Sequence, residues 1–358
     1  MLHRPALVQA WNKGGQTVEL VTDGVTIKQE GYEIEAIHDL AGATELGRCQ
    51  NSRSNGTGDV IDNLIVTTKT IHTISALSAI KRRLTQGSTI LFTQNGMGTI
   101  DEVNAKLFQD SRTRPKYMTA IVSHGVYSKG PFSSVHAGNG TIHIGRVHQT
   151  PPFDARLPAK EREGQDSTLS SLGYLSTLIT QVPVLAATVV TPIELMQIQF
   201  EKLIVNAMIN PLTVVFDCRN GELFSKANIL RLVRSLLSEA SHVIRSLPEL
   251  QHVQRIESRF SKERLDELVL RAAEKTSRNF SSMVQDARAG KETEIDYING
   301  YIVEKGEQVG VDCVYNRRLV QMVKDREKIT DAEVDDFFPH RRSQFQALSR
   351  RKIDCDLG

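Results

Sequence analysis

Cysteine is scarce in this chain of 358 residues, which has only four. Cys49, Cys218, Cys313 and Cys355 are too far apart in the sequence to form a C-x-x-C pair. That spacing argues against a zinc site and against a disulfide framework, and it fits a reducing compartment. We therefore expect no bound metal and a cytoplasmic location, with the mitochondrion as the alternative.

Long apolar runs and an excess of charge are also missing. No apolar run approaches the roughly 20 residues that a membrane-spanning helix needs, and the start, MLHRPALVQAW, is too short and too polar for a signal peptide. The net charge is +2, which gives no electrostatic reason to bind nucleic acid or an anionic membrane. We expect neither partner. Residues 341–358, which include a basic stretch, are expected to form a flexible tail.

The first half of the chain alternates strand-like and helical patterns. Residues 63–67 and 89–92 are short apolar runs typical of strands buried on both faces, and residues 71–84 between them have helical spacing. A third strand is expected at 117–122. This alternation predicts a doubly wound parallel sheet, in which ligands bind at the carboxyl ends of the strands. Lys69 and Asn95 follow two such ends and are therefore candidate ligand contacts.

From Pro192 onward the pattern is helical, over 192–208, 227–245, 261–276 and stretches beyond 294. Residues 149–166 are rich in proline, glycine and charge, and we interpret them as a surface loop. We place a domain boundary near Thr191, which gives an α/β domain over 1–190 and a helical domain over 191–340.

The segment from Glu201 to Pro211 carries the clearest chemical signal. On a helix, Lys202, Asn206 and Asn210 lie four residues apart and share one face. Burying a lysine and two amides among leucine, isoleucine and valine is costly unless they have partners. The spacing is compatible both with a polar stripe facing water and with a binding site.

Two other segments combine small polar residues with a carboxylate or a glycine turn. Asn95 stands in the turn QNGMG after a predicted strand, and the stretch NFSSMVQD at 279–286 is followed by TEIDYING at 293–300. Taken alone, the first could be an ordinary glycine-rich turn, and the serines and Glu294 could be helix caps.

Together these segments resemble the ketopantoate reductase (2-dehydropantoate 2-reductase) family. The resemblance rests on QNGMGTIDE at 94–102, on KLIVNAMINPLT at 202–213 with RNGEL at 219–223, and on SSMVQD at 281–286 with TEIDYING at 293–300. It covers residues from about 2 to about 326. It implies a Rossmann-like α/β domain followed by a helical domain, and reduction of 2-dehydropantoate to pantoate with NADPH, toward pantothenate and coenzyme A.

The resemblance also implies roles for individual residues. Lys202 matches the catalytic lysine that donates a proton, and Glu294 matches an acid at the reaction centre, where cofactor and substrate meet. The residues that match substrate contacts are Lys202, Asn206, Asn210, Asn220, Asn279 and Ser282. Those that match cofactor contacts are Arg4, Lys69, Asn95, Val126 and Glu294. Arg4 stands where a basic residue accommodates the 2′-phosphate of NADP.

The sequence departs from the family at its beginning. The family starts with a strand, a G-x-G-x-x-G turn and a helix, and Gly14, Gly15 and Gly24 have no such context, nor have Gly56 and Gly58. We expect a doubly wound sheet without its first strand and glycine loop. Two other functions stay open: an NADPH reductase of another branched 2-keto acid, and a catalytically dead, truncated homologue that acts as a binding or dimerising module. A homodimer formed through the helical domain is a further expectation.

Overall fold

The computed structural model describes residues 1–37, 59–147 and 171–338. The predicted loop at 149–166, the predicted tail at 341–358 and the glycines at 56 and 58 lie outside these ranges. The chain divides into two compact units: Met1–Gln94 with Thr99–Ile198, here called the α/β unit, and Asn95–Gly98 with Gln199–Gly358, here called the helical unit. The main division falls within one long helix, a few residues after Thr191. A short loop interrupts the first unit and belongs to the second.

A five-stranded sheet forms the centre of the α/β unit, in the order β11-β10-β7-β6-β5. Its strands are β5 (Asn63–Val66), β6 (Thr89–Phe92), β7 (Lys116–Val122), β10 (Ile142–Arg146) and β11 (Ala187–Val189). The strands β5, β6 and β7, each of which is predicted from the sequence, run parallel. However, β10 pairs antiparallel with β7, so the sheet is mixed and not wholly parallel as expected.

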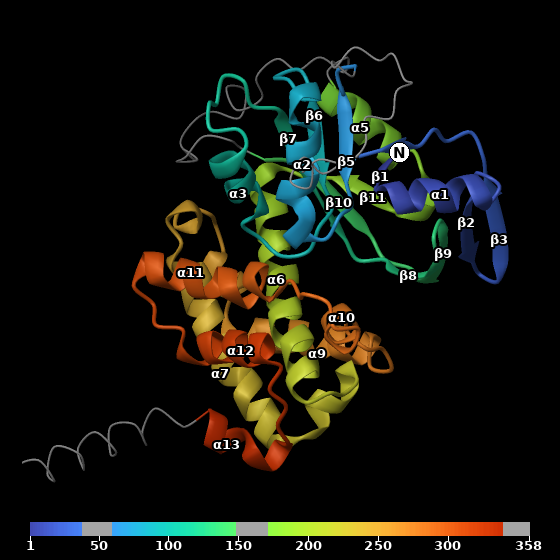
Figure 1. Cartoon of the computed structure of the whole chain (residues 1–358). Coiled ribbons are helices and arrows are strands. Elements are labelled where there is room, and N and C mark those ends of the chain that lie inside the picture. Colours follow the sequence, from blue (N-terminus) through green and yellow to red (C-terminus); the bar gives the residue numbers. More distant parts are fainter. Residues whose placement is uncertain (38–58, 148–170, 339–358) are drawn as a thin grey trace, which may run out of the picture. The chain divides into compact units, whose positions relative to one another are not determined.

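Helices cover both faces of this sheet (Figure 1). The elements are η2 (Thr70–His72), α2 (Thr73–Ile80), η3 (Lys81–Arg83), α3 (Thr99–Lys106), α5 (Ser171–Thr180) and η4 (Pro183–Leu185). Ile90 packs in one core cluster with Leu77 of α2 and Val103 of α3. Leu91, the next residue of β6, packs in the other cluster with Leu175 of α5. Successive side chains of a strand point to opposite faces, so β6 is buried on both sides.

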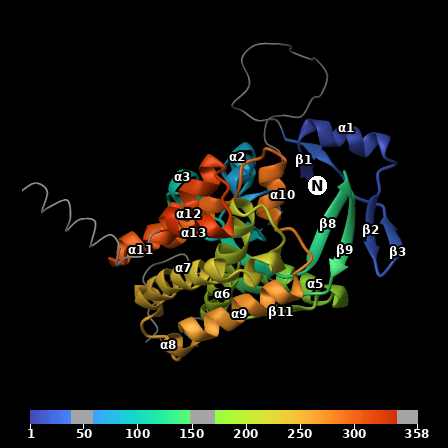
Figure 2. The same ribbon diagram turned by 90° about the horizontal axis from the view of Figure 1, so that it is seen from below.

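A second sheet of four strands has the order β3-β2-β9-β8 and lies beside α1 (Pro5–Lys13), as Figures 1 and 2 show. Its strands are β2 (Val18–Thr22), β3 (Val25–Gln29), β8 (Gly125–Gly130) and β9 (Ser133–Gly138). Asp23 and Gly24 form the turn of a hairpin, because β2 and β3 pair there and both residues have positive φ. The sequence analysis missed β8, β9 and β10; β8 is largely exposed and has no apolar alternation.

A third, two-stranded sheet consists of β1 (Leu2–His3) and β4 (Glu35–Ala36), which run parallel. A cavity of about 470 Å³ separates it from β5, with Leu2 and Ile37 on one side and Leu64 on the other. Arg83 closes one end through two bonds of 2.9 Å to the carboxylate of Glu35. In the ranges that the structure describes, no strand lies between β1 and β5, so each keeps one edge without a ladder partner.

The helical unit contains the C-terminal part of α6 (Pro192–Val215) and the helices that follow it in the sequence. The other elements are η5 (Asn220–Ser225), α7 (Ala227–Ser246), η6 (Pro248–Leu250), α8 (Ile256–Arg259), α9 (Lys262–Lys275), α10 (Ser282–Arg288), η7 (Ile295–Tyr297), α11 (Asn299–Val309), α12 (Val314–Asp325), η8 (Asp331–Glu333) and α13 (Val334–Phe337). Ile204, Ala207 and Met208 of α6 are completely buried. Among the described helices, none is both long and apolar enough to cross a membrane.

Candidate functional site

Helix α6 presents the predicted row of polar side chains. Lys202, Asn206 and Asn210 are half-buried, whereas Leu203 and Ala207, which turn to other faces, are buried. The three polar residues follow one another at intervals of four along a continuous helix, so they occupy one stripe on its surface. The prediction that they share a face is therefore confirmed.

Lys202 has an altered acidity. Burial lowers the pKa of its ammonium to about 8, and the negative charge of Glu294 partly opposes that shift. Glu294 is half-buried and precedes η7. An amine with a pKa near 8 can both release and accept a proton close to neutral pH, whereas an exposed lysine with a pKa of about 10.4 seldom does. The two residues predicted to be catalytic thus act on each other electrostatically.

The loop Asn95–Gly98 belongs to the same unit as Lys202 and Glu294. The amide of Met97 donates a hydrogen bond of 2.8 Å to the carbonyl oxygen of Tyr297, three residues after Glu294. Gly96 has a φ of +80°, and a Cβ there would lie 2.5 Å from the same carbonyl oxygen. Only glycine allows this approach. The QNGMG turn therefore has a structural reason for its glycine, and it brings Asn95 to the TEIDYING segment.

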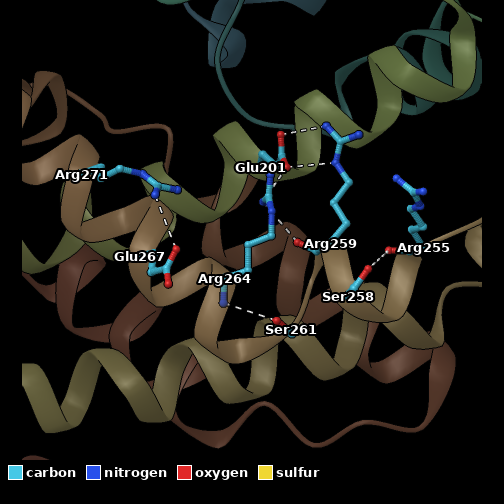
Figure 3. Close-up of polar contacts among 8 residues, drawn as sticks. All are labelled: Glu201, Arg255, Ser258, Arg259, Ser261, Arg264, Glu267 and Arg271. Carbon is cyan, nitrogen blue, oxygen red and sulfur yellow. Dashed lines mark hydrogen bonds and ion pairs between the residues drawn. The ribbon is translucent and has the colours of Figure 1, made fainter.

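A half-buried carboxylate, that of Glu201, joins α6 to two other helices next to Lys202. Glu201 accepts two hydrogen bonds of 3.0 Å from the guanidinium of Arg259, and Arg264 lies 2.9 Å from its Oε1 (Figure 3). Arg259 ends α8 and Arg264 stands in the first turn of α9. Paired guanidinium–carboxylate bonds are stronger than single neutral ones and restrict geometry. This contact joins α6 to both helices, and the sequence analysis did not find it.

The end of α6 is joined to the serine motif through Ser281. Thr213 donates a hydrogen bond of 2.7 Å to the backbone oxygen of Asn210, so its hydroxyl accepts from the hydroxyl of Ser281, also at 2.7 Å. Ser281 in turn caps α10 by accepting from the amide of Val284. The expectation that this serine pair includes a helix cap is correct for Ser281. Ser282, the predicted substrate contact, is exposed beside it.

Asn220 and Asn279 also lie together. The amide N–H of Asn220 donates to the carbonyl oxygen of Asn279 at 3.0 Å, and its side-chain Nδ2 donates to Thr276 at 3.0 Å. Asn220 is 6% exposed, and its Oδ1 meets no hydrogen-bond donor in the part of the chain that the structure describes. Asn279 is exposed. A buried amide oxygen without a partner is uncommon, and it is an acceptor that a ligand hydroxyl could use.

The predicted cofactor contacts other than Asn95 and Glu294 belong to the α/β unit. Arg4 is exposed, follows β1 directly and precedes α1, as expected for a residue at a strand end. Lys69 is half-buried and follows β5, at the start of η2. Val126 lies on β8 and is 56% exposed. Two of these residues thus stand past strand ends, where ligands of doubly wound sheets bind.

Comparisons with known proteins identify the family. The family model described as Ketopantoate reductase PanE/ApbA matches residues 1–149, and its C-terminal counterpart matches residues 194–327. The probable 2-dehydropantoate 2-reductase of Schizosaccharomyces pombe is 34% identical over 268 residues, 74% of each chain. The ketoisovalerate reductase of Beauveria bassiana is 26% identical and covers 91% of this chain and 76% of its own.

A solved structure agrees with these matches. The probable 2-dehydropantoate 2-reductase of Bacillus subtilis has a TM-score of 0.62 and 25% identity, covering 90% of both chains. The fold is thus a Rossmann-like α/β unit followed by a helical unit, as the sequence predicts. The chain belongs to the ketopantoate reductase family, which is a family of oxidoreductases.

Proposed function

We propose that this protein reduces 2-dehydropantoate to pantoate with NADPH, a step toward pantothenate and coenzyme A in the cytoplasm. The observation that carries the proposal is Lys202, an amine with a pKa of about 8 that is coupled to Glu294 and shares a helix face with Asn206 and Asn210. A reductase of a keto acid needs a proton donor and polar groups that orient a carboxylate and a ketone, and these side chains supply both.

The chemistry of the residues follows from their charges. A nicotinamide cofactor, when bound, would supply a hydride to the keto carbon, and negative charge would then develop on the keto oxygen. The ammonium of Lys202 polarises that carbonyl and then transfers a proton from Nζ to the oxygen, so the product is a hydroxy acid and the lysine becomes neutral. Glu294 raises the pKa of Lys202 and so keeps the donor protonated. Because this pKa lies above 7, the ammonium form of Lys202 predominates at pH 7.

Amides and a serine hold the substrate in this proposal. Asn206, Asn210, Asn279 and Ser282 can each donate and accept hydrogen bonds, which suits a molecule with carboxylate, ketone and hydroxyl groups. The Oδ1 of Asn220, which has no donor among the described residues, is assigned to the substrate hydroxyl. A ketone of the same shape without that hydroxyl would leave this oxygen unsatisfied, which costs binding free energy.

The cofactor site fits NADPH in part. We assign Asn95 and Glu294 to its nicotinamide half, because the loop that carries Asn95 is held against Tyr297. Arg4 is assigned to the 2′-phosphate and Lys69 and Val126 to the remaining contacts. Among the described residues, no turn between a strand and a helix has the G-x-G-x-x-G pattern that binds pyrophosphate. We also propose a homodimer that forms through the helical unit. Light scattering would measure its molar mass in solution.

The test is turnover by the full chain. We expect NADPH oxidation with 2-dehydropantoate, and a fall in kcat of about 10²–10⁴ for Lys202→Ala with little change in melting temperature. Lys291→Ala, at an exposed lysine of the same unit, is the matched control. Parental turnover by Lys202→Ala would show that the lysine has no such role.

A second substrate is measured alongside the first, because one relative is a ketoisovalerate reductase. Ketoisovalerate lacks the hydroxyl that we assign to Asn220, so kcat/KM should favour 2-dehydropantoate, and Asn220→Ala should remove that preference. A preference for ketoisovalerate would support the other branched 2-keto acid. Binding of neither substrate nor NADPH would support the catalytically dead module.

A further inference from the structure

Pro211 interrupts the hydrogen-bond ladder of α6 four residues after Ala207. In an α-helix the amide of each residue donates to the carbonyl oxygen four residues earlier, and proline has no amide hydrogen. The carbonyl of Ala207 therefore loses its regular partner. Ala207 is 0% exposed, so water does not replace that partner. A buried carbonyl without a donor would destabilise the helix at this point.

The side chain of Asn299 supplies the missing donor. Its Nδ2 lies 3.1 Å from the carbonyl oxygen of Ala207 and 3.0 Å from Oδ1 of Asn316, and Asn299 is completely buried. Both hydrogens of the amide are thus used. Exchanging the nitrogen and oxygen of Asn299 would place an oxygen against two other oxygens, so the orientation is determined by the contacts.

Asn299 is itself held by a buried polar network. Asn316 donates to Oε2 of Glu239 from its backbone N–H at 3.0 Å and from Nδ2 at 2.8 Å. Tyr315 donates its amide hydrogen to the other oxygen, Oε1, at 3.0 Å. Glu239 lies on α7, Asn316 on α12 and Asn299 on α11. Three helices therefore fix the position of the Ala207 carbonyl on α6, and the bonds that join Asn299, Asn316 and Glu239 are all buried.

The supported carbonyl lies within the row of substrate residues. Ala207 follows Asn206, and Pro211 follows Asn210. Proline bends a helix at the turn where its ring meets the carbonyl four residues back. A bend at Pro211 would change the direction of Asn210 relative to Lys202 and Asn206. We propose that Asn299 is a positioning residue, which fixes the bend of α6 at Pro211 and so aligns the two asparagines for the keto acid. The proposal rests on the proposed function.

A double-mutant cycle in the full chain tests it. Asn299→Leu removes the donor at similar size, and Pro211→Ala restores a backbone N–H for Ala207. We expect Asn299→Leu to lower the melting temperature and to raise the KM for 2-dehydropantoate about tenfold or more, with the KM for NADPH unchanged. In the Pro211→Ala background the same substitution should cost much less in both measurements. Asn228→Leu is the control, because Asn228 donates at 3.0 Å to a carbonyl away from α6 and should change stability alone.

Each outcome decides the matter. Equal effects of Asn299→Leu in both backgrounds would overturn the link to Pro211. A lower melting temperature with an unchanged KM would leave Asn299 a purely structural residue. If the Asn299→Leu variant does not fold, the double variant Asn299→Leu with Pro211→Ala replaces it, and a soluble double variant supports the link between the two residues. In that case the single variant Pro211→Ala must also change the KM for the keto acid. If the parent chain shows no turnover, the proposed function is refuted. If the parent chain is active but no variant changes its KM, only the positioning role of Asn299 is refuted.

Discussion

At the scale of single residues, some residues of the family motifs stabilise the fold, whereas others are available for chemistry. The asparagine of TEIDYING donates to α6, and the glycine after Asn95 allows the amide of Met97 to reach Tyr297. Ser281 caps a helix, whereas Ser282 beside it is exposed. A motif read only as a set of ligand contacts would therefore assign too many of its residues to the substrate.

The pKa of Lys202 gives a prediction about pH. Reduction needs its ammonium form, so kcat should fall as the pH rises through about 8, while the reverse oxidation, which needs the neutral amine, should speed up over the same range. Glu294→Gln removes the charge that raises this pKa, so both midpoints should move to lower pH. Initial rates in both directions measure them. Glu292→Gln, at an exposed neighbour, should shift neither midpoint, and an unchanged profile in Glu294→Gln would refute the coupling.

Arg4 gives a prediction about cofactor choice. Arg4→Asp replaces a cation that can pair with a 2′-phosphate by an anion that repels it, so the affinity for NADPH should fall more than that for NADH. Calorimetric titration of the full chain with each nucleotide measures both. Arg82→Asp, another exposed arginine of the α/β unit, is the control. Equal loss of the two cofactors would remove Arg4 from the site.

At the scale of elements, the helix α6 shows what the sequence can and cannot predict. Its apolar spacing predicts a helix from Pro192 to Met208, whereas the structure continues it to Val215, through Pro211. A proline inside a helical pattern normally ends or bends the helix. Here a side chain 88 positions beyond Pro211, on another helix, satisfies the carbonyl that the proline leaves unpaired. Such long-range contacts have no local sequence signal.

The sheets also show that elements which depend on long-range contacts have no local sequence signal. The buried strands β5, β6 and β7 could be predicted because runs of valine, isoleucine and leucine mark them. The exposed strand β8, with the sequence GVYSKG, depends on pairing with β9 and has no apolar pattern. In the candidate site, too, only the residues with a local sequence pattern could be predicted. Lys202, Asn206 and Asn210 were found by helical spacing, whereas Glu201 and Asn299 needed the packing of other helices.

Glu201 gives a prediction at this scale. Glu201→Gln leaves two guanidinium groups without their carboxylate, and the side chain of Glu201 is only 15% exposed. We expect the free energy of unfolding to fall by about 1–3 kcal/mol, measured by urea denaturation. Glu267→Gln breaks the 3.5 Å pair with Arg271 on α9, where both side chains are more than 60% exposed. That control should change stability by less than about 0.5 kcal/mol.

At the scale of the whole molecule, β1 and β5 each have one edge without a ladder partner among the described residues, and we expect these edges to govern association in solution. An unpaired strand edge is a template for pairing with another chain, and a charge on the edge prevents this. We expect association that grows with concentration in light scattering, and we expect Ile65→Lys on β5 to reduce it. Leu178→Lys on α5 is matched in exposure, at 45% for both residues, and should have no such effect. Equal behaviour of the two variants would exclude β5 as the contact.

The division of the chain has a consequence for how it is made. Met97 pairs with Tyr297, so the loop that completes the helical unit leaves the ribosome about two hundred residues before its partner. At ~5–20 residues per second, that gap lasts roughly 10–40 s, during which the amide of Met97 can bond only to water or to a chaperone. Closing so long a loop is slow compared with forming a helix. The pairing of Met97 with Tyr297 is therefore expected to form late in folding, long after the loop itself has been made.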